Sequence, residues 1–346
     1  MFSAAQKSGR VKKVSKYIAV AYSGLGTPYV YNWSASGFGS KIADPASAIA
    51  GGNYQFAFSP DGNYVAIGST GIPYVTAYPW SSSGFGARYS DPATLPSGGL
   101  AAGGVGLVFS PSSDSLAMAV FSSPYINIYA WSSSGFGSKY SNPATLPTGG
   151  GNGIAFSPDG SAVALAHDTA PCISVYPWSS ASGFGTKYSN PASTPSISGK
   201  GVAFSPSGNA IAVTSYGAPY ILAYAWSSSG FGTQYSSPAT SPGTTCYGVA
   251  FSPLGDSIAV ARNAISPGIV AYPWSSASGF GAKYSDPANS FGALGVAFNA
   301  SGTALAAAAT GSPYVYVYPW SSSGFGTKYA NPGTAIPNQG YSVVFG

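Results

Sequence analysis

Acid–base chemistry in this sequence would have to rest on very few side chains. The 346 residues contain no glutamate, eight aspartates and one histidine, His167. General acid–base catalysis depends on such side chains being held within reach of the reacting atoms. Five of the aspartates have a structural explanation, because three share a repeat position that asparagine fills elsewhere and two lie in turns (Asp44, Asp91, Asp286, Asp61 and Asp159). The pair His167-Asp168 has the features of an exposed polar loop. We therefore predict no catalytic residue and a protein that is not an enzyme.

Metal and cofactor sites are not indicated either. Cys172 and Cys246 lie in different repeats and neither has the CxxC spacing of a zinc site or a redox motif. No set of acidic and amide side chains is placed to hold a central calcium ion, and no glycine-rich phosphate loop opens a helix. The sequence predicts no metal and no cofactor.

A repeat of about 48 residues organises the chain. Its register is set by seven tryptophans, each followed by a serine-rich stretch and Gly-Phe-Gly (Trp33, Trp80, Trp131, Trp178, Trp226, Trp274 and Trp320). A short segment of alternating character, such as residues 73–80, precedes each tryptophan. Alternation with a period of two is typical of a β-strand. The recurring aromatic residues are expected to fill the space between neighbouring sheets.

Each repeat predicts four strands, which we call a, b, c and d. In the second repeat we expect them at residues 55–59, 63–69, 74–80 and 86–92. The Ser-Pro-Asp-Gly sequence at 59–62 predicts a tight turn between strands a and b, because proline suits its first corner and glycine its left-handed position.

The two ends of the chain complement each other. The first repeat begins at Tyr17 with strand b and lacks strand a, whereas residues 341–345 match a strand a and have no repeat of their own. We predict an all-β fold, a single seven-bladed β-propeller over residues 17–346, in which the C-terminal strand completes blade one.

Residues 1–16 form a basic segment ahead of this ring. It holds five of the 13 basic residues (Lys7, Arg10, Lys12, Lys13 and Lys16), and the other eight balance the eight aspartates. Such a segment is either an arm that docks onto an acidic partner or a solvated terminus. No apolar stretch has the length of a secretory signal core or a membrane span, so neither export nor membrane insertion is expected.

The Phe-Ser-Pro-Asp-Gly turn followed by an apolar strand resembles WD40-type propeller repeats over residues 17–346. The Trp-Asp and Gly-His elements of that family are absent, so its hydrogen-bond tetrad is not carried over. The phrase Tyr-Pro-Trp-Ser-Ser-Ser-Gly-Phe-Gly, continuing into Thr-Lys-Tyr-Ser-Asn-Pro-Ala, is similar to propeller repeats of tailed-bacteriophage gene products. That resemblance implies a virion setting and no defined activity.

The repeats differ from one another mainly in their b–c and d–a connections, which a propeller places on one face. Exposed loops on a rigid scaffold often carry recognition. The residues there that the repeat does not require are our candidates for ligand binding (Phe121, His167, Asp168, Tyr216, Arg262 and Asn263). Neutral drift in tolerant loops is the alternative explanation.

These observations lead to a hypothesis of a non-enzymatic bacteriophage virion protein, a capsid decoration or a tail-associated component. The arm would dock onto other virion proteins, and the variable face would meet host-surface glycans. The alternatives are a cytoplasmic interaction scaffold of WD40-like type and a propeller hydrolase of the lactonase type. Nucleic-acid binding is not expected, because no basic stripe lies outside the arm.

Overall fold

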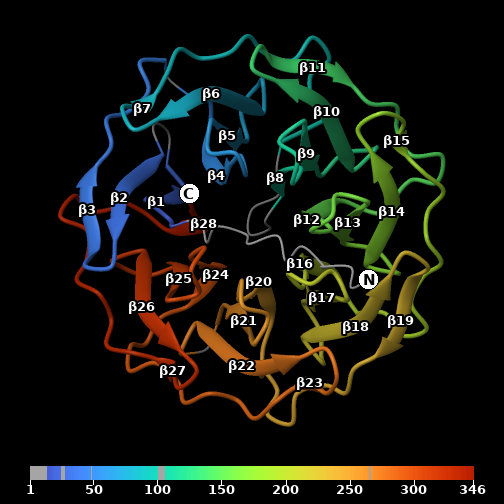
Figure 1. Ribbon diagram of the computed structural model, residues 1–346, viewed down its shortest axis with the longest axis vertical. Coiled ribbons are helices and arrows are strands. Elements are labelled where there is room, and N and C mark those ends of the chain that lie inside the picture. Colours follow the sequence, from blue (N-terminus) through green and yellow to red (C-terminus); the bar gives the residue numbers. More distant parts are fainter. Residues whose placement is uncertain (1–13, 25–27, 48, 100–105, 265) are drawn as a thin grey trace, which may run out of the picture.

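The fold is a ring of seven antiparallel sheets around a central axis (Figure 1). The computed structural model describes the chain except for residues 1–13, 25–27, 48, 100–105 and 265. The described residues form 28 strands in seven four-stranded sheets. Within these residues no helix is present that could cross a membrane. The predicted seven-bladed propeller is confirmed.

The strands of each blade run from the axis outward as a, b, c and d. Blade 1 contains β28 (Gly340–Phe345), β1 (Tyr17–Tyr22), β2 (Tyr29–Ser34) and β3 (Gly37–Lys41). Blade 2 contains β4 (Asn53–Phe58), β5 (Tyr64–Ser69), β6 (Val75–Ser81) and β7 (Gly84–Phe85). Blade 3 contains β8 (Leu107–Phe109), β9 (Ser115–Ala119), β10 (Ile126–Ser132) and β11 (Gly135–Lys139).

Four further blades complete the ring. Blade 4 contains β12 (Gly151–Phe156), β13 (Ala162–His167), β14 (Ile173–Ser179) and β15 (Gly183–Phe184). Blade 5 contains β16 (Gly199–Phe204), β17 (Ala210–Ser215), β18 (Ile221–Ser227) and β19 (Gly230–Gln234). Blade 6 contains β20 (Cys246–Phe251), β21 (Ser257–Arg262), β22 (Ile269–Ser275) and β23 (Gly279–Phe280). Blade 7 contains β24 (Ala293–Phe298), β25 (Ala304–Ala309), β26 (Val315–Ser321) and β27 (Gly324–Phe325).

The ring is closed by the C-terminal strand. β28 pairs antiparallel with β1, with Ile18 opposite Phe345 and Val20 opposite Val343. The backbone amide of Lys16 also donates to the carbonyl oxygen of Gly346 over 2.7 Å. Blade 1 is therefore built from both ends of the chain, as the sequence predicts, and this pairing covers the inner backbone edge of β1.

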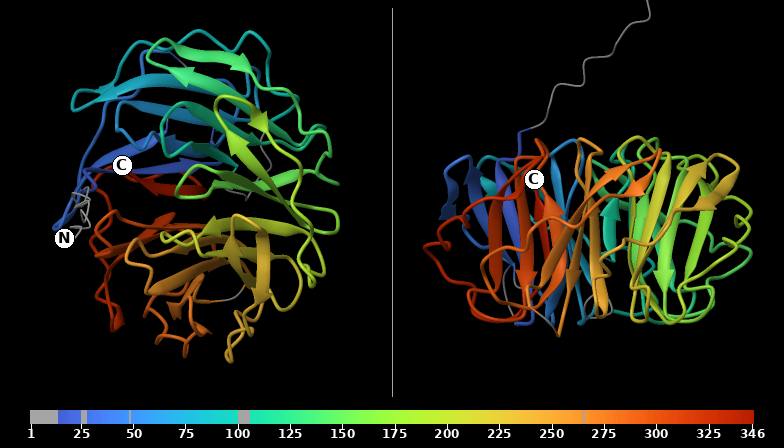
Figure 2. Two further views of the ribbon diagram at one scale, coloured as in Figure 1. Left: turned by 45° about the vertical axis from the view of Figure 1, so that its right-hand side comes forward. Right: turned by 90° about the horizontal axis from the view of Figure 1, so that it is seen from below.

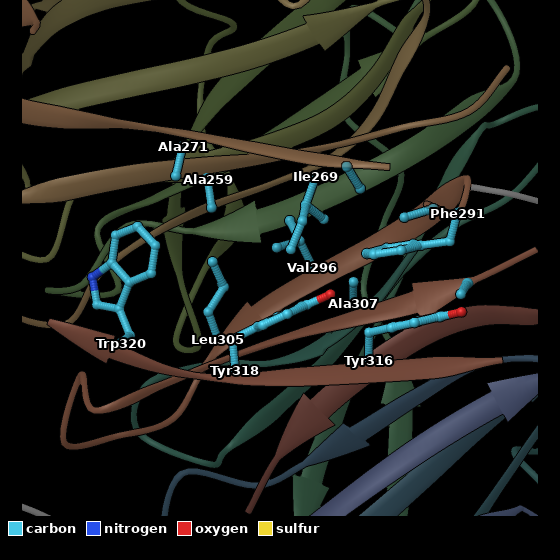
Figure 3. Packing of buried hydrophobic residues seen from close by; sticks show 13 residues of the cluster. Ala259, Ile269, Ala271, Phe291, Val296, Leu305, Ala307, Tyr316, Tyr318 and Trp320 are labelled. Carbon is cyan, nitrogen blue, oxygen red and sulfur yellow. The ribbon is translucent and has the colours of Figure 1, made fainter. Parts of the chain in front are cut away.

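The core lies between adjacent blades and consists of small aliphatic and large aromatic side chains. Between blades 6 and 7, Ala259 and Ala271 face Leu305 and Trp320 (Figure 3). Strand b is apolar on both sides because each of its faces meets a blade, and the residues of β25 are all buried. This double burial explains why strand b lacks the alternation seen in strand c.

Aromatic pairs connect each blade to the next. Six of the seven tryptophans meet edge-on the tyrosine that follows strand d of the preceding blade, at ring separations of 4.8–5.4 Å (Trp33–Tyr329, Trp131–Tyr89, Trp178–Tyr140, Trp226–Tyr188, Trp274–Tyr235 and Trp320–Tyr284). Edge-to-face contact is a favoured geometry for aromatic rings. The packing role expected for these residues is confirmed.

Strand d is shorter than predicted in four blades. β7 covers Gly84–Phe85 only, where the sequence had suggested residues 86–92. The blades with a two-residue strand d carry proline immediately before the tryptophan (Pro79, Pro177, Pro273 and Pro319). The three with a five-residue strand d carry Asn32, Ala130 or Ala225 there. Proline has no N–H to donate, so the ladder ends beside it.

The ring has two distinct faces, seen edge-on in Figure 2. The a–b face carries the a–b turns and the c–d hairpins, and the C-terminal residue lies there. The b–c face carries the b–c and d–a connections. These b–c connections are more regular than expected, since five contain a proline followed by a residue with positive φ (Tyr74, Tyr125, Cys172, Tyr220 and Tyr314).

Candidate functional site

Seven of the eight aspartates have a structural role that occupies their carboxylates. Three pair with a lysine or arginine three residues earlier on the rim of the ring (Asp44, Asp91 and Asp286). Four accept a hydrogen bond from the first residue of an a–b turn (Asp61, Asp114, Asp159 and Asp256). Asp168 alone remains, on the b–c face at the start of a connection.

Asp168 is the centre of a polar group that spans blades 4 and 5. Its Oδ1 atom accepts hydrogen bonds from Ser198 Oγ at 2.5 Å, Asn152 Nδ2 at 2.8 Å and Lys200 Nζ at 3.1 Å. Asn152 and Lys200 are the second residues of β12 and β16, the innermost strands of neighbouring blades (Figure 1). The group therefore lies at the inner edge of the ring.

The two carboxylate oxygens of Asp168 differ in their surroundings. All three donors converge on Oδ1, whereas no described residue donates to Oδ2. The side chain is 33% exposed and that of Lys200 is 17% exposed. Solvent or a ligand can therefore reach this group. Oδ2 is the oxygen with lone pairs left to accept a proton or a hydrogen bond.

The Asp168 carboxyl is held in its ionised form. Burial opposes ionisation, but the hydrogen bonds from Ser198 and Asn152 and the charge of Lys200 outweigh it, so the pKa lies below the ordinary value. Asn152 is itself fixed, because it is 4% exposed and its amide also donates to the carbonyl oxygen of Gly199 at 2.8 Å. The carboxylate is thus charged and rigidly oriented.

Exposed aromatic rings flank the Asp168 group on both sides. Lys200 Nζ lies 5.9 Å from the ring centroid of Tyr216, which is 52% exposed. Phe121 is 61% exposed, and a Cβ placed on Gly150 would lie 3.0 Å from its ring and 3.2 Å from Asp168 Oδ2. Phe121 and Asp168 therefore border the same point of the surface. Three of the six predicted ligand-binding residues are brought together: Phe121, Asp168 and Tyr216.

His167 does not lie on an exposed loop as expected. It is the last residue of β13, is 0% exposed, and its Nε2 lies 3.0 Å from Ser174 Oγ. Burial lowers its pKa to about 4, so the ring is neutral at physiological pH. Nδ1 has no hydrogen-bond partner among the described residues. Successive residues of a strand point to opposite sides, which separates His167 from the exposed Asp168.

Arg262 is also buried, contrary to the expectation of an exposed binding residue. It ends β21, is 6% exposed, and its guanidinium donates to the carbonyl oxygens of Pro267 and Pro242. It thereby joins two loops of the b–c face. Asn263, the next residue, is half-buried and its side chain accepts a hydrogen bond from the amide of Ala264 at 2.9 Å. No contact recorded in the structure links Asn263 to Asp168.

The proposed docking arm is mostly outside the described residues. This applies to Lys7, Arg10, Lys12 and Lys13. Lys16 is exposed on the a–b face, and the docking role of the arm stays a prediction.

Sequence reasoning missed Asn152, Ser198 and Lys200. A comparison of the repeats could have found two of them. The second residue of strand a is a large apolar or aromatic residue in blades 6, 7 and 1 (Tyr247, Leu294 and Tyr341). In blades 4 and 5 it is Asn152 and Lys200. Polar residues at this position in two neighbouring blades, at the inner edge of the ring, are the signal for a site.

Comparisons with known proteins identify the fold. No family model and no curated protein matches the sequence. A Bacteroides uniformis protein assigned as a 6-phosphogluconolactonase matches with a TM-score of 0.72 at 14% identity, over 96% of this chain and 100% of that one. A Bacteroides fragilis protein with the same assignment has a TM-score of 0.73 at 10% identity, over 98% and 99%. A periplasmic gluconolactonase of Pseudomonas aeruginosa has a TM-score of 0.70 at 15% identity, over 96% and 99%.

These similarities correct the functional hypothesis from the sequence. The prediction of a non-enzymatic bacteriophage virion protein is wrong, because no family evidence for phage repeats was found and these three similar folds carry lactonase names. At 10–15% identity the likeness establishes the fold of this chain and not its activity.

Proposed function

We propose that this propeller hydrolyses a sugar lactone at the group formed by Asp168 and Lys200. The observation that carries the proposal is the asymmetry of Asp168, whose Oδ1 is saturated by three donors while Oδ2 stays open beside an exposed surface. The lactonase names of the similar folds support the choice of substrate class.

The reaction requires only groups that this site contains. Water adds to the lactone carbonyl carbon, the ring C–O bond breaks, and a hydroxy acid is formed. Oδ2 of Asp168 accepts the proton of the attacking water and returns it to the leaving alkoxide. The Lys200 ammonium stabilises the negative charge that develops on the carbonyl oxygen. Ser198 and Asn152 keep the carboxylate oriented.

The flanking rings suit a sugar-derived substrate. Phe121 and Tyr216 are exposed on either side of the polar group. An aromatic face packs against the C–H face of a sugar ring, while the polar centre binds its oxygens. A lactone held between these two rings would have its carbonyl carbon beside Asp168.

The test measures hydrolysis of glucono-δ-lactone. The rate of acid release is recorded at constant pH, and the uncatalysed rate is subtracted. We expect Asp168→Asn to lower kcat/KM by at least about 100-fold, the lower range for loss of a general base. Lys200→Gln is expected to lower kcat more than it raises KM, because its charge acts on the transition state.

Asp286→Asn is the matched control. Asparagine stands at the equivalent place in other repeats, where Asn142 and Asn331 each accept a hydrogen bond from a lysine. This variant should keep its activity within about twofold of the parent protein. Hydrolysis by Asp168→Asn at the parent rate, or none above background by the parent protein, would refute the proposed function.

A further inference from the structure

A cavity of about 630 Å³ opens on the a–b face, where Lys16 and Tyr17 meet Gly346. It is remote from the Asp168 group, which lies on the opposite face. Its walls come from blades 1, 2 and 7 (residues 14–17, 58–62, 80–82, 345–346 and Ala300). This volume is in the range of about 300–1,000 Å³ that is typical of ligand sites.

The a–b turns of the other blades pack against one another in series. A Cβ placed on the turn glycine would lie within 4 Å of a residue of the preceding turn in four cases (Gly160 beside Pro111, Gly208 beside Pro158, Gly255 beside Pro206, and Gly302 beside Leu254). The backbone amide of Asp61 likewise donates to Ser113 Oγ of the next turn at 3.2 Å. Each turn is thus covered by a neighbour.

This series is interrupted at blade 1, which has no a–b turn. Its strand a ends at Phe345 and its strand b begins at Tyr17, at opposite ends of the chain. A Cβ placed on Gly62 would meet no atom within 4 Å. Residues 14–16 cover the blade 7 side of this gap, where Ser15 Oγ accepts a hydrogen bond from the amide of Ala300 at 2.9 Å, and the cavity is the space left beside them.

The floor of the cavity is aromatic, and its wall carries the cation Lys16 and the carboxylate of Asp61, which Ser59 and Asn63 already bond. The ring of Tyr17 lies 5.0 Å from that of Trp80, and the ring of Phe58 lies 5.5 Å from Trp80. Lys16 is exposed in the wall and forms no ion pair with any described residue. The other turns show what such a surface accepts, namely a proline ring over glycine.

We propose that this cavity is a docking site for a proline-containing acidic turn of a partner protein, with the chemistry of the chain's own Ser-Pro-Asp-Gly turns. The proline of the partner turn packs on Gly62 and on the aromatic floor, as Pro111 does against Gly160. Its carboxylate pairs with Lys16. This proposal does not depend on the hydrolase function.

The experiment measures binding of a fluorescent cyclic peptide that contains Phe-Ser-Pro-Asp-Gly-Asn, by polarisation, to the full chain. A cyclic peptide is used because a preformed turn loses less conformational entropy on binding. We expect saturable binding that weakens when the peptide proline is replaced by alanine, or its aspartate by asparagine.

Two matched variants locate the site. Ser82→Trp places a large ring in the cavity and should weaken peptide binding by at least about tenfold. Ser133→Trp changes the same repeat position in blade 3, where the side chain is also exposed and does not line the cavity, and should leave binding unchanged. Absence of saturable binding, or equal binding by both variants, would overturn the proposal. A melting temperature equal to that of the parent protein would show that each variant is folded.

Discussion

The hydroxyl of Tyr31 donates a hydrogen bond of 2.7 Å to the carbonyl oxygen of Thr334, 303 residues away in the sequence. The same contact recurs around the ring, where the strand-c tyrosine reaches the d–a connection of the preceding blade, as in Tyr176 to Thr145 at 2.8 Å and Tyr224 to Ser193 at 2.7 Å. The hydrogen bond from Tyr31 to Thr334 joins blade 1 to the segment that follows blade 7. It therefore contributes to closure of the ring.

Removing the Tyr31 hydroxyl should weaken this closure. Tyr31 is 0% exposed, so Tyr31→Phe leaves the carbonyl of Thr334 without its donor. We expect the free energy of unfolding, from urea denaturation, to fall by about 1 kcal/mol. Tyr29 lies in the same strand and its hydroxyl forms no hydrogen bond with a described residue, so Tyr29→Phe should have a smaller effect. Equal losses for the two variants would show that the bond to Thr334 does not matter.

Deleting the C-terminal strand β28 should have a much larger effect on stability. Loss of residues 340–346 removes β28, exposes the backbone edge of β1 and uncovers the buried Ile18 and Val20. Exposed edges and apolar surface favour aggregation. We expect insoluble protein, or a melting temperature far below that of the full chain, by circular dichroism. An unchanged melting temperature would be incompatible with closure through β28.

Acid should destabilise the fold through His167. Its pKa is about 4 in the folded protein and its ordinary value is 6.5. Between these two pH values the unfolded chain binds the proton and the folded protein does not, so the free energy of unfolding falls as the pH falls. The full loss for this group is about 3 kcal/mol.

The His167→Gln variant isolates this contribution, because the sequence contains no other histidine. Glutamine can still bond to Ser174 but does not titrate. Its urea midpoint should change less between pH 7 and pH 4.5 than that of the parent protein. Identical pH profiles would mean that His167 is accessible to protons in the folded state.

Replacing Pro79 should lengthen the outer strand of blade 2. The residue before the tryptophan is alanine in blade 3, where β11 has five residues, and proline in blade 2, where β7 has two. Pro79→Ala restores an N–H to the ladder. We expect the amide of residue 79 to exchange slowly with deuterium, as the amide of Ala130 should in the parent protein. Fast exchange at residue 79 would indicate another cause for the short strand.

Much of the fold could be predicted from the sequence, because each repeat carries its own local instructions. Tyr17 begins a repeat that lacks strand a, and residues 341–345 supply one, so the closure follows from matching two segments. The shortened strand d could also have been predicted, since a proline such as Pro79 has no donor whatever its surroundings.

The candidate site depended on tertiary structure. Asp168 and Asn152 come from blade 4, whereas Ser198 and Lys200 lie at or just before the first strand of blade 5, and only the packing of these two blades brings them together. From the sequence alone, the adjacent residues His167 and Asp168 both have the character of exposed loop residues. The pairing of His167 with Gly151 places the first inside a strand and leaves the second at the surface. Sequence determined the repeat and its closure because these are local patterns repeated seven times. Tertiary structure decided which polar side chains are buried and which converge, because that depends on contacts between blades.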